Sequence, residues 1–260
     1  MNKTLNFGRL FLFSPARAAA ACAEDRALAD AMRIYALTLL AGAVFRYWKP
    51  YDFPDANVAA PLRPQGMFFW LKVMMWQPLL MTAMTGFCGA LLQWMKDGWL
   101  PLKVITSFLW TAIPVVLMVC FLPRDSGQTA AYLTKNQFQI LFLLWLLPTF
   151  FFVWEVPSKL WRPLAAFLLV MNIVELVAFI PQAIVTAMRW ESGYKAVVGV
   201  AGFWMLIGGA LGLKTLAPCR PLPRALLPLL FALVLQIEVV FVAFTLGWLP
   251  LETLKALLYG

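Results

Sequence analysis

Apolar residues occur along this chain in blocks of about twenty, separated by short clusters of Lys, Arg, Pro and Asp. At the helical rise per residue, a block of this length matches the hydrocarbon core of a bilayer. The pattern predicts an all-α integral membrane protein, a polytopic helical bundle of about seven spans. The number is six if the first block lies in the interface. We expect spans at 31–48, 67–95, a third ending near 122, then 138–156, 163–188, 196–216 and 225–249.

Residues 1–30 differ from these blocks and predict a short amphipathic helix at the cytoplasmic interface. The apolar run Leu10 to Phe13 is too short for the core of a signal peptide. Ser14 and Pro15 match a helix N-cap followed by proline in the first turn, so we expect a helix from Pro15 to about Glu24. The chain is predicted to be one membrane domain over 1–260, with a segment at 1–30, a bundle at 31–249 and a tail at 250–260.

Polar residues at the ends of the blocks suggest anchors and loops. Asp30 and Arg33 are spaced to pair on one helical face, and 46–49 combines aromatic and basic residues typical of an interface.

The segment 50–65 is expected to be extended because it contains Pro50, Pro54, Pro61 and Pro64. Prolines inside the blocks are expected to free a carbonyl and bend the helix; they are Pro78, Pro114, Pro148 and Pro181.

Composition excludes several kinds of chemistry. Hydrophobic residues make up 63% of the 260 residues and charged residues 13%, which does not suit a water-soluble surface. The chain has no histidine, so neither zinc-protease HExxH chemistry nor a Ser-His-Asp triad is available. The four cysteines are isolated and are interpreted as small apolar residues rather than metal ligands. We therefore expect no catalytic residues, no metal site and no cofactor.

The net charge of +9 reflects membrane topology rather than nucleic-acid binding. The basic residues are spread over every loop and form no stripe, so no nucleic-acid partner is expected. For seven spans, twelve basic residues fall on the side of the N-terminus and eight on the other. The positive-inside rule then predicts a cytoplasmic N-terminus and an exported C-terminus, in the inner membrane of a bacterium.

The strongest candidate for a functional site lies in the fifth block. Glu175 lies near its middle, and a helical stripe contains Asn172, Gln182, Thr186 and Arg189 as well. A carboxylate there costs about 2.5–3.5 kcal/mol on insertion scales, and the surrounding apolar residues offset that cost. The stripe predicts either a substrate, ion or proton path or an interhelical hydrogen-bond staple.

Glu238 in the seventh block is a second intramembrane carboxylate. Gln236 lies two residues away and points to nearly the opposite side, so the two do not form one site. Lys72, near the start of the second block, can reach the interface or turn inward to pair with Glu175 or Glu238. No sequence feature selects among these arrangements.

Small residues at helical spacing predict close helix packing. Gly208 and Gly212 form a GxxxG pair, and Gly86 with Ala90 forms a similar one. Such faces suit internal packing or a homo-oligomer. The expected partners are the lipid bilayer and, beyond it, other membrane proteins or a second copy of the chain.

Three segments resemble the bacterial branch of the YIP (Ypt/Rab-interacting protein) family. The first segment, FLFSPARAAAACAED, looks like the family's Ser-Pro opening. The second, LPLKVITSFLWTAIPVVLM, is similar to the family's middle span, which has an internal proline. The third, FWMLIGGALGLKTLAPCRPLPRALLPLL, is similar to the family's Gly-Leu-Lys and basic-Ala-Leu sequence. The resemblance covers about a third of the chain and implies a non-enzymatic multi-pass protein with a cytoplasmic N-terminus. The family usually has five spans, whereas 136–188 here adds a helical pair.

The leading functional hypothesis is a non-enzymatic scaffold that organises membrane or partners, as the resemblance implies. The alternative is a transporter or permease subunit with a polar path lined by the fifth span around Glu175. An intramembrane lipid-modifying enzyme that works through Arg, Lys and Glu ranks third. The hypotheses differ in whether the face that contains Glu175 is polar and open or dry and packed.

Overall fold

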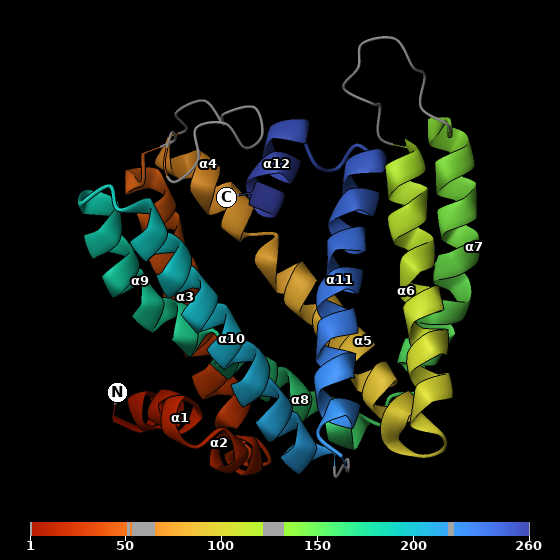
Figure 1. The fold of residues 1–260 in the computed structure, drawn as a ribbon, viewed down its shortest axis with the longest axis horizontal. Helices are drawn as coiled ribbons and strands as arrows, with labels where there is room; N and C mark the ends of the chain where they lie inside the picture. The colour runs from red at the N-terminus through yellow and green to blue at the C-terminus, as the bar shows by residue number, and fades with distance from the viewer. Residues whose placement is uncertain (1, 51–52, 54–65, 122–132, 218–220, 260) are drawn as a thin grey trace.

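The protein folds as a bundle of helices in the computed structural model (Figure 1). The structure describes residues 2–50, 53, 66–121, 133–217 and 221–259, and all the regular secondary structure in these ranges is helical. The helices are α1 Asn2–Phe13, α2 Pro15–Ala21, α3 Ala27–Trp48, α4 Met67–Met74, α5 Gln77–Lys96, α6 Leu100–Phe121, α7 Lys135–Trp154, α8 Ser158–Met171, α9 Ile173–Ala187, α10 Glu191–Leu216, α11 Pro223–Thr245 and α12 Leu251–Tyr259.

Seven helical segments of the described chain are long and apolar enough to cross a membrane, which confirms the predicted all-α polytopic bundle. Their bounds lie close to those expected from the apolar blocks. They are Ala27–Trp48, Met67–Lys96, Leu100–Cys120, Asn136–Trp154, Ser158–Ala187, Glu191–Leu216 and Pro223–Thr245. The protein is therefore an integral multi-pass membrane protein whose helices contact the lipid bilayer.

Two of the seven spans are interrupted. The sequence predicted a bend at Pro78 in the second span, but it predicted no break at Asn172 in the fifth. The second span consists of α4, which ends at Met74, and α5, which begins at Gln77. Pro78 explains this interruption because proline lacks an N–H and is best accommodated in the first turn of a helix. The fifth span consists of α8 and α9, which meet at Asn172 without a proline at the junction.

The other mid-span prolines do not interrupt their helices. Helix α6 continues through Pro114, α7 through Pro148 and α9 through Pro181. Pro114 has no N–H for the carbonyl of Trp110, four residues earlier. The indole Nε1 of Trp145 in α7 donates to that carbonyl at 3.1 Å. A side chain of the neighbouring helix thus replaces the missing backbone donor.

A second indole completes the connection between α6 and α7. Trp110 Nε1 donates to Thr149 Oγ1 at 3.0 Å, and that hydroxyl donates to the carbonyl of Trp145 at 2.9 Å. The two indole rings also lie 5.9 Å apart. These contacts hold α6 and α7 together at the edge of the bundle, on the opposite side from α3 and α9 (Figure 1).

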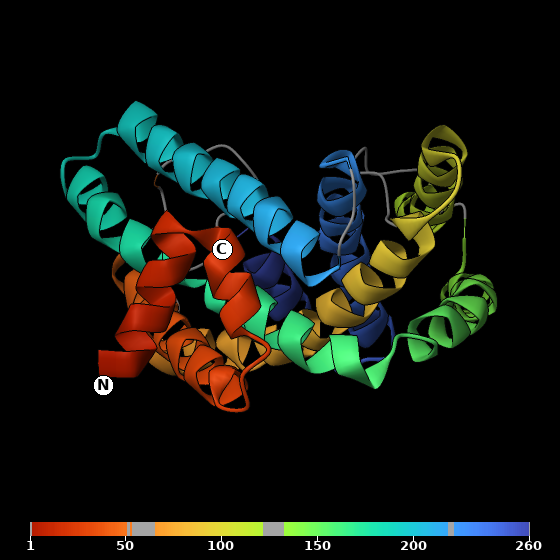
Figure 2. The same cartoon turned by 90° about the horizontal axis from the view of Figure 1, so that it is seen from below.

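The N-terminal helices lie across one end of the bundle, as the view from below shows (Figure 2). The expected helix at Pro15 is present as α2, but α1 before it was not predicted. Phe11 of α1 is fully buried, and its ring lies 5.5 Å from that of Phe167 in α8. Helices α1 and α2 are therefore part of the packed structure rather than a tail.

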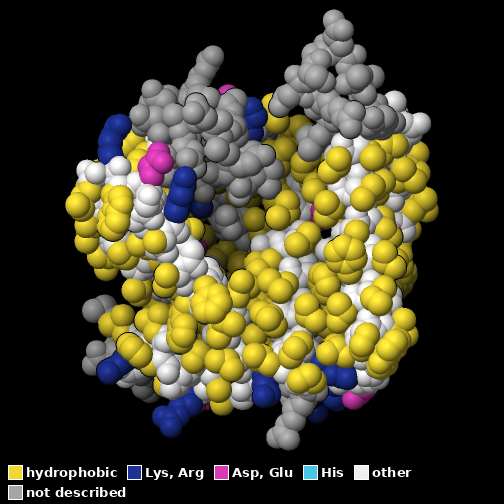
Figure 3. Space-filling model, in the orientation of Figure 1, with side chains coloured by type: hydrophobic (Ala, Val, Ile, Leu, Met, Phe, Trp, Pro, Cys, Tyr) yellow, Lys and Arg dark blue, Asp and Glu magenta, His cyan; other side chains and the backbone are white. Residues whose placement is uncertain are grey.

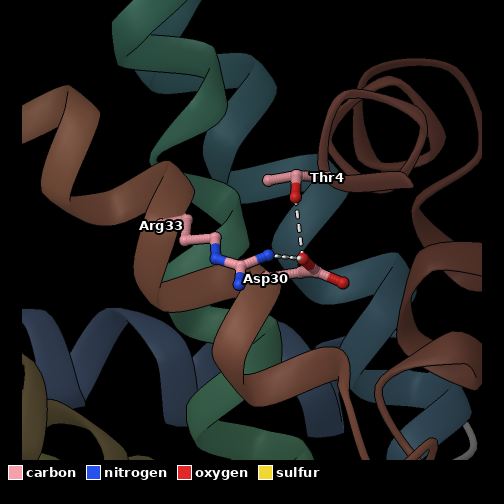
Figure 4. Close-up of polar contacts among 3 residues, drawn as sticks. All are labelled: Thr4, Asp30 and Arg33. Carbon is pink, nitrogen blue, oxygen red and sulfur yellow. Dashed lines mark hydrogen bonds and ion pairs between the residues drawn. The ribbon is translucent and has the colours of Figure 1, made fainter. Parts of the chain in front are cut away.

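A small polar cluster ties α1 to the first turn of α3 (Figure 4). Thr4 Oγ1 donates to Asp30 Oδ1 at 2.7 Å, and Arg33 Nη1 lies 3.1 Å from the same oxygen. The predicted pairing of Asp30 with Arg33 is thus confirmed. The negative charge of Asp30 also interacts favourably with the positive, N-terminal end of the α3 helix dipole.

Arg224 fixes the start of α11 against the end of α5. Its guanidinium donates to the carbonyls of Met95 at 2.7 Å, Lys96 at 2.8 Å and Gly98 at 2.7 Å. Carbonyls at the end of a helix have no partner within that helix, and a cation there also suits the helix dipole. One arginine thus completes the hydrogen bonding of the turn between the second and third spans.

Apolar side chains cover most of the face seen in Figure 3, as expected for contact with lipid. Lys and Arg side chains lie mainly towards the upper and lower ends of the molecule in this view. The face is recessed between α10 and α11 (Figure 3).

The predicted tail contains a further helix, α12. The proline-rich segment 54–65 lies outside the described residues.

We predict that Trp145→Phe lowers the stability of the protein by about 1–2 kcal/mol, since the carbonyl of Trp110 loses its donor. The loss should be much smaller in the background Pro114→Ala, because residue 114 then supplies a backbone N–H to that carbonyl. Reversible unfolding in mixed micelles measures both effects in a double-mutant cycle. Equal losses in the two backgrounds would contradict the assigned role of Trp145.

Candidate functional site

The interruption of the fifth span at Asn172 is held by side-chain hydrogen bonds. Asn172 Nδ2 donates to the carbonyls of Leu168 at 3.1 Å and Leu169 at 3.2 Å at the end of α8. Thr38 Oγ1 of α3 lies 3.0 Å from the carbonyl of Ile34 in its own helix and 3.3 Å from the carbonyl of Asn172, so its single hydrogen is shared between the two. Lipid offers no hydrogen bonds, so irregular backbone at this depth requires such partners from the protein. The side chain of Asn172 thus adds to the backbone hydrogen bonds that cross the break, from Asn172 N–H to Leu169 and from Leu176 N–H to Asn172.

Glu175 occupies the first turn of α9, directly after the break. The positive end of the helix dipole favours a carboxylate at this position. Glu175 is partly buried, and it accepts no hydrogen bond from the residues that the structure describes. The interhelical staple predicted as one alternative for this residue would require such a bond.

A polar face of α3 lies opposite Glu175. It contains Tyr35, Thr38, Arg46 and Lys49, which follow the spacing of one helical face. Thr38 lies 3.3 Å from the carbonyl of Asn172, and α3 packs against α9, so this face of α3 meets the start of α9. The polar groups on this face form a column along α3, from the level of the break at Asn172 towards the end of α3.

Arg46 connects the two interrupted spans. Its Nη1 donates to Met74 Sδ at 3.5 Å, and Met74 is the last residue of α4 before the first interruption. The Arg46 charge also acts on Glu175, just after the second interruption. Helix α3 packs against α4, α8 and α9, so it lies beside both breaks.

Tyr194 and Lys49 form the upper end of the column. The Lys49 ammonium lies 5.4 Å from the centroid of the Tyr194 ring, at the start of α10. Burial, and next the charge of Arg46, lower the pKa of Lys49. Because the folded state then binds this proton less tightly than the unfolded chain, the stability linked to Lys49 rises with pH up to about its ordinary pKa.

The rest of the predicted stripe is only partly assembled. Gln182 and Thr186 are buried on α9 at 7% and 1% exposure, on the bundle side of the helix. Arg189 lies past the end of α9, exposed, with a backbone φ of 49°. Asn172 belongs to the junction rather than to a continuous helix. The structure thus brings Asn172 and Glu175 together with α3.

Glu238 forms a separate feature. Its side chain is 1% exposed within α11, and neither carboxylate oxygen has a hydrogen-bond partner among the described residues. Lys72, named as a candidate partner of Glu175 or Glu238, is exposed on α4. The cation that acts on Glu175 is Arg46 instead.

The predicted small-residue pairs pack inside the chain. A Cβ on Gly208 would meet the ring of Phe11 at 3.3 Å, and one on Gly212 would meet Phe167 Cζ at 2.0 Å. In α5, a Cβ on Gly86 would lie 2.8 Å from Val153 Cγ1, and Ala90 is buried. These glycines admit the side chains of α1, α7 and α8.

The cysteines and carboxylates offer no metal centre in the described part of the chain, where no group of three potential metal ligands occurs. Cys22 and Cys88 are buried, and neither they nor Cys120 forms a disulfide. Burial raises the pKa of the Cys22 thiol to about 12, so its reactive thiolate is scarce at neutral pH. Cys219 lies outside the described residues.

Arg46 was interpreted from the sequence as an interfacial anchor at the end of the first span, and it was not paired with Glu175. The signal lay in its spacing, since Tyr35, Thr38 and Lys49 fall on the same helical face. That the residue faces Glu175 depends on packing between helices far apart in the chain, which spacing does not reveal.

Comparison with known proteins assigns no function to this site. No family model, curated protein or solved structure matches the chain. The geometry of the two interrupted spans and the column between α3 and α9 therefore carries the functional argument.

We predict that Glu238→Met raises stability by about 1–3 kcal/mol, because it removes a buried carboxyl group without a hydrogen-bond partner. Glu252→Met on the exposed face of α12 is the control and should change stability by less than about 0.5 kcal/mol. Unfolding in mixed micelles measures both. A clear loss for Glu238→Met would mean that the carboxyl group stabilises the fold.

Two glycines of α10 provide a matched pair for the packing analysis. Gly212→Ala should lower stability by about 1–3 kcal/mol, because Phe167 is fully buried and leaves no room for the new Cβ. A Cβ on Gly199 meets nothing within 4 Å, so Gly199→Ala should leave stability unchanged or raise it slightly. Thermal unfolding of the two variants tests this, and equal effects would contradict it.

Proposed function

We propose that this protein is a transporter or permease subunit whose polar path runs between α3 and α9. The observation that carries the proposal is the packing of α3 against both interrupted spans, with Arg46 of α3 donating to Met74 Sδ at the end of α4 and Thr38 of α3 in contact with the carbonyl of Asn172. Interrupted membrane helices next to one another are typical of substrate sites in transporters.

The energetic cost of the site supports the same proposal. A glutamate within a membrane span is expensive to insert and usually marks a path or binding site, whereas Arg46 lies in the last turn of α3, near the interface. Here Glu175 gains no hydrogen bond from the described residues, and Arg46 gains one to a thioether, which is a weak acceptor. A pair retained only for stability would be expected to have closer partners.

The proposed topology has a cytoplasmic N-terminus in a bacterial inner membrane. Basic residues near α1, α2 and the ends of their neighbouring helices support this orientation. Arg162 at the start of α8 lies 3.2 Å from Asp25, between α2 and α3. The column that contains Arg46 and Lys49 would then open towards the exported side.

A scaffold that binds other membrane proteins is the second candidate, in line with the resemblance to the YIP family. The observation that favours it is the face of α10 around Gly199 and Gly202, where a Cβ would meet nothing within 4 Å. Glycines at such a face allow another helix to approach closely. This role requires no flux and no contribution from Glu175.

Counterflow into proteoliposomes distinguishes the two candidates. Liposomes that contain the purified protein are loaded with a mixture of small polar metabolites and diluted into isotope-labelled forms of the same compounds. We expect uptake of at least one compound, and Glu175→Gln should reduce it about tenfold or more by removing a charge from the path. Glu252→Gln, a matched change on the exposed face of α12, should leave uptake unchanged.

Chemical labelling tests whether the site is open to water. In a variant without native cysteines, Glu175→Cys should react with a membrane-impermeant thiol reagent, whereas Val174→Cys, buried on the same helix, should not. Lack of both flux and labelling at residue 175 would exclude the transport proposal and favour the scaffold.

A further inference from the structure

Glu238 is a buried carboxylate that the proposed path between α3 and α9 does not use. Its side chain is 1% exposed, and neither carboxylate oxygen has a hydrogen-bond partner among the described residues. Charged groups inside a membrane span are paired or belong to an ion or substrate site, because an uncompensated charge is costly there. Glu238 lies in α11, apart from the column along α3, so a function for it has to be sought among its own neighbours.

Two hydroxyl groups of α6 are unpaired in the same way. Ser107 and Thr111 are 4% and 5% exposed, and neither hydroxyl forms a hydrogen bond with a described residue. Together with Pro114 they are the only buried residues between 100 and 120. The two hydroxyl residues lie one turn apart on the same face of the helix. The buried side of α6 is therefore its polar side.

Most hydroxyl groups of the long helices bond to their own helix, as is usual for threonine in an apolar environment. Six threonines donate to the carbonyl four residues earlier, namely Thr38, Thr82, Thr85, Thr106, Thr149 and Thr215. Ser107 and Thr111 do not form this bond, although Thr106 on the exposed side of the same helix does. Their oxygens are thus free to act as ligands.

The face of α6 that contains Ser107 and Thr111 is turned towards α11. Helix α6 packs mainly against α7 and α11, and the three helices lie side by side in both views (Figures 1 and 2). Trp110 is on the side of α6 that bonds to α7, through Thr149. Ser107 and Thr111 lie about 60–100° around the helix from Trp110, where α11 is the neighbour.

Glu238 is on the matching side of α11. It shares one helical face with Phe241 and Thr245, at spacings of three and seven residues. The ring of Phe241 lies 6.2 Å from that of Phe138 in α7, and the carbonyl of Thr245 accepts from Gln139 Nε2 at 3.1 Å. This face of α11 is therefore directed to the pair formed by α6 and α7.

The lower ends of α6 and α11 set the height of Glu238. The two helices run in the same direction (Figure 1), and Arg224 at the start of α11 donates to the carbonyl of Gly98 just before α6. Glu238 lies 14 residues after Arg224, and Thr111 lies 13 residues after Gly98. At about 1.5 Å per residue, Glu238 and Thr111 are thus at nearly the same level of the membrane.

The upper end of α11 gives the same result independently. Helix α7 runs opposite to α11 (Figure 1), and Gln139 bonds to the carbonyl of Thr245. Glu238 lies seven residues before Thr245, and Trp145 lies six residues after Gln139, so these two are level. Trp145 in turn donates to the carbonyl of Trp110, the neighbour of residue 111 in α6.

The oxygens brought together in this way suit a cation. They are the two carboxylate oxygens of Glu238 and the hydroxyl oxygens of Ser107 and Thr111, which do not hydrogen-bond with one another. A cation with ligands at about 2.3–2.6 Å, the range for Ca²⁺ and for Na⁺ of similar size, can join oxygens that are beyond hydrogen-bond distance of each other. Carboxylate and hydroxyl oxygens are hard ligands of the kind that such ions prefer.

The single carboxylate selects the charge of this cation. A monovalent ion makes the site neutral, whereas a divalent ion would leave a net positive charge in a low-dielectric interior. Four oxygens are too few for K⁺, which is surrounded by rings of carbonyl oxygens in its channels. The expected absence of a metal site was based on histidine and cysteine, which have no part here.

We propose that Glu238, Ser107 and Thr111 bind one sodium ion between α6 and α11. The inference does not rest on the path between α3 and α9, and it concerns binding alone.

Equilibrium binding of isotope-labelled sodium to the purified full-length protein tests the proposal. Scintillation proximity in choline buffer measures the binding, with unlabelled sodium, potassium, magnesium and calcium as competitors. We expect one ion per chain, displaced about tenfold more effectively by sodium than by the other three. No saturable binding, or displacement by potassium or calcium as readily as by sodium, would overturn the proposal.

The charge of Glu238 is tested by Glu238→Gln, which keeps the shape of the side chain. Sodium at a hundredfold excess over its Kd should raise the thermal midpoint of the native protein by about 5 °C or more relative to choline. Glu238→Gln should fold in choline but lose both the sodium shift and the binding. Glu252→Gln on exposed α12 should keep both. Sodium binding that survives in Glu238→Gln would overturn the proposal, and the gain expected for Glu238→Met should be largest in choline.

Two threonines of α6 provide a matched pair for the hydroxyl ligands. Thr111→Val should weaken sodium binding about tenfold, as should Ser107→Ala, because each removes one ligand. Loss of a buried hydroxyl without a partner should not destabilise the fold. Thr106→Val, where the hydroxyl is exposed and bonded to Leu102, should leave the affinity unchanged. Native affinity in both Thr111→Val and Ser107→Ala would overturn the assignment.

The outcomes for this site and for the proposed transport function are distinguishable. Sodium binding without counterflow would exclude the transport proposal alone. Counterflow by a protein that does not bind sodium would exclude this inference alone.

Discussion

Hydrocarbon supplies no hydrogen bonds, and every backbone group released from a helix in this protein must therefore find a partner within the chain. The fold shows two solutions to this constraint. Trp145 donates to the carbonyl that Pro114 leaves without an N–H, and Asn172 donates to two carbonyls at the break of the fifth span. The first also joins two helices, whereas the second lies within one span. Arg224 has a similar role outside the spans, where it donates to three carbonyls at the turn that follows α5.

The same constraint explains where polar groups gather. Both interrupted spans pack beside α3, and that helix presents Tyr35, Thr38, Arg46 and Lys49 on one face. Thr38 contacts the carbonyl of Asn172, which also accepts from Leu176 N–H, whereas Arg46 donates only to Met74 Sδ among the described residues. The groups that hold the break are thus distinct from Arg46 and Glu175, although both sets lie on the same helices.

The sequence predicted the spans well because their length and hydrophobicity are local properties. The stripe that contains Glu175 and Gln182 was also visible, since helical spacing reports which residues share a face. The interruption at Asn172 was not predicted, because an asparagine in an apolar block gives no signal comparable to Pro78 in the first turn of α5. Nor did the spacing identify Arg46 as the cation near Glu175, or Trp145 as the donor to Trp110. Such pairings join residues far apart in the chain and depend on how complete helices pack.

The burial of Phe11 has a consequence for the order of assembly. Helices α1 and α2 are synthesised first, and Thr4 of α1 bonds to Asp30 in the first span, but Phe167 and Gly208 belong to the fifth and sixth spans. The contacts of Phe11 can therefore form only after most of the chain has been synthesised. An apolar side next to basic residues suits the earlier period, because it allows a helix to lie in the headgroup region. The burial of Phe11 thus depends on α8 and α10, which follow it far along the chain.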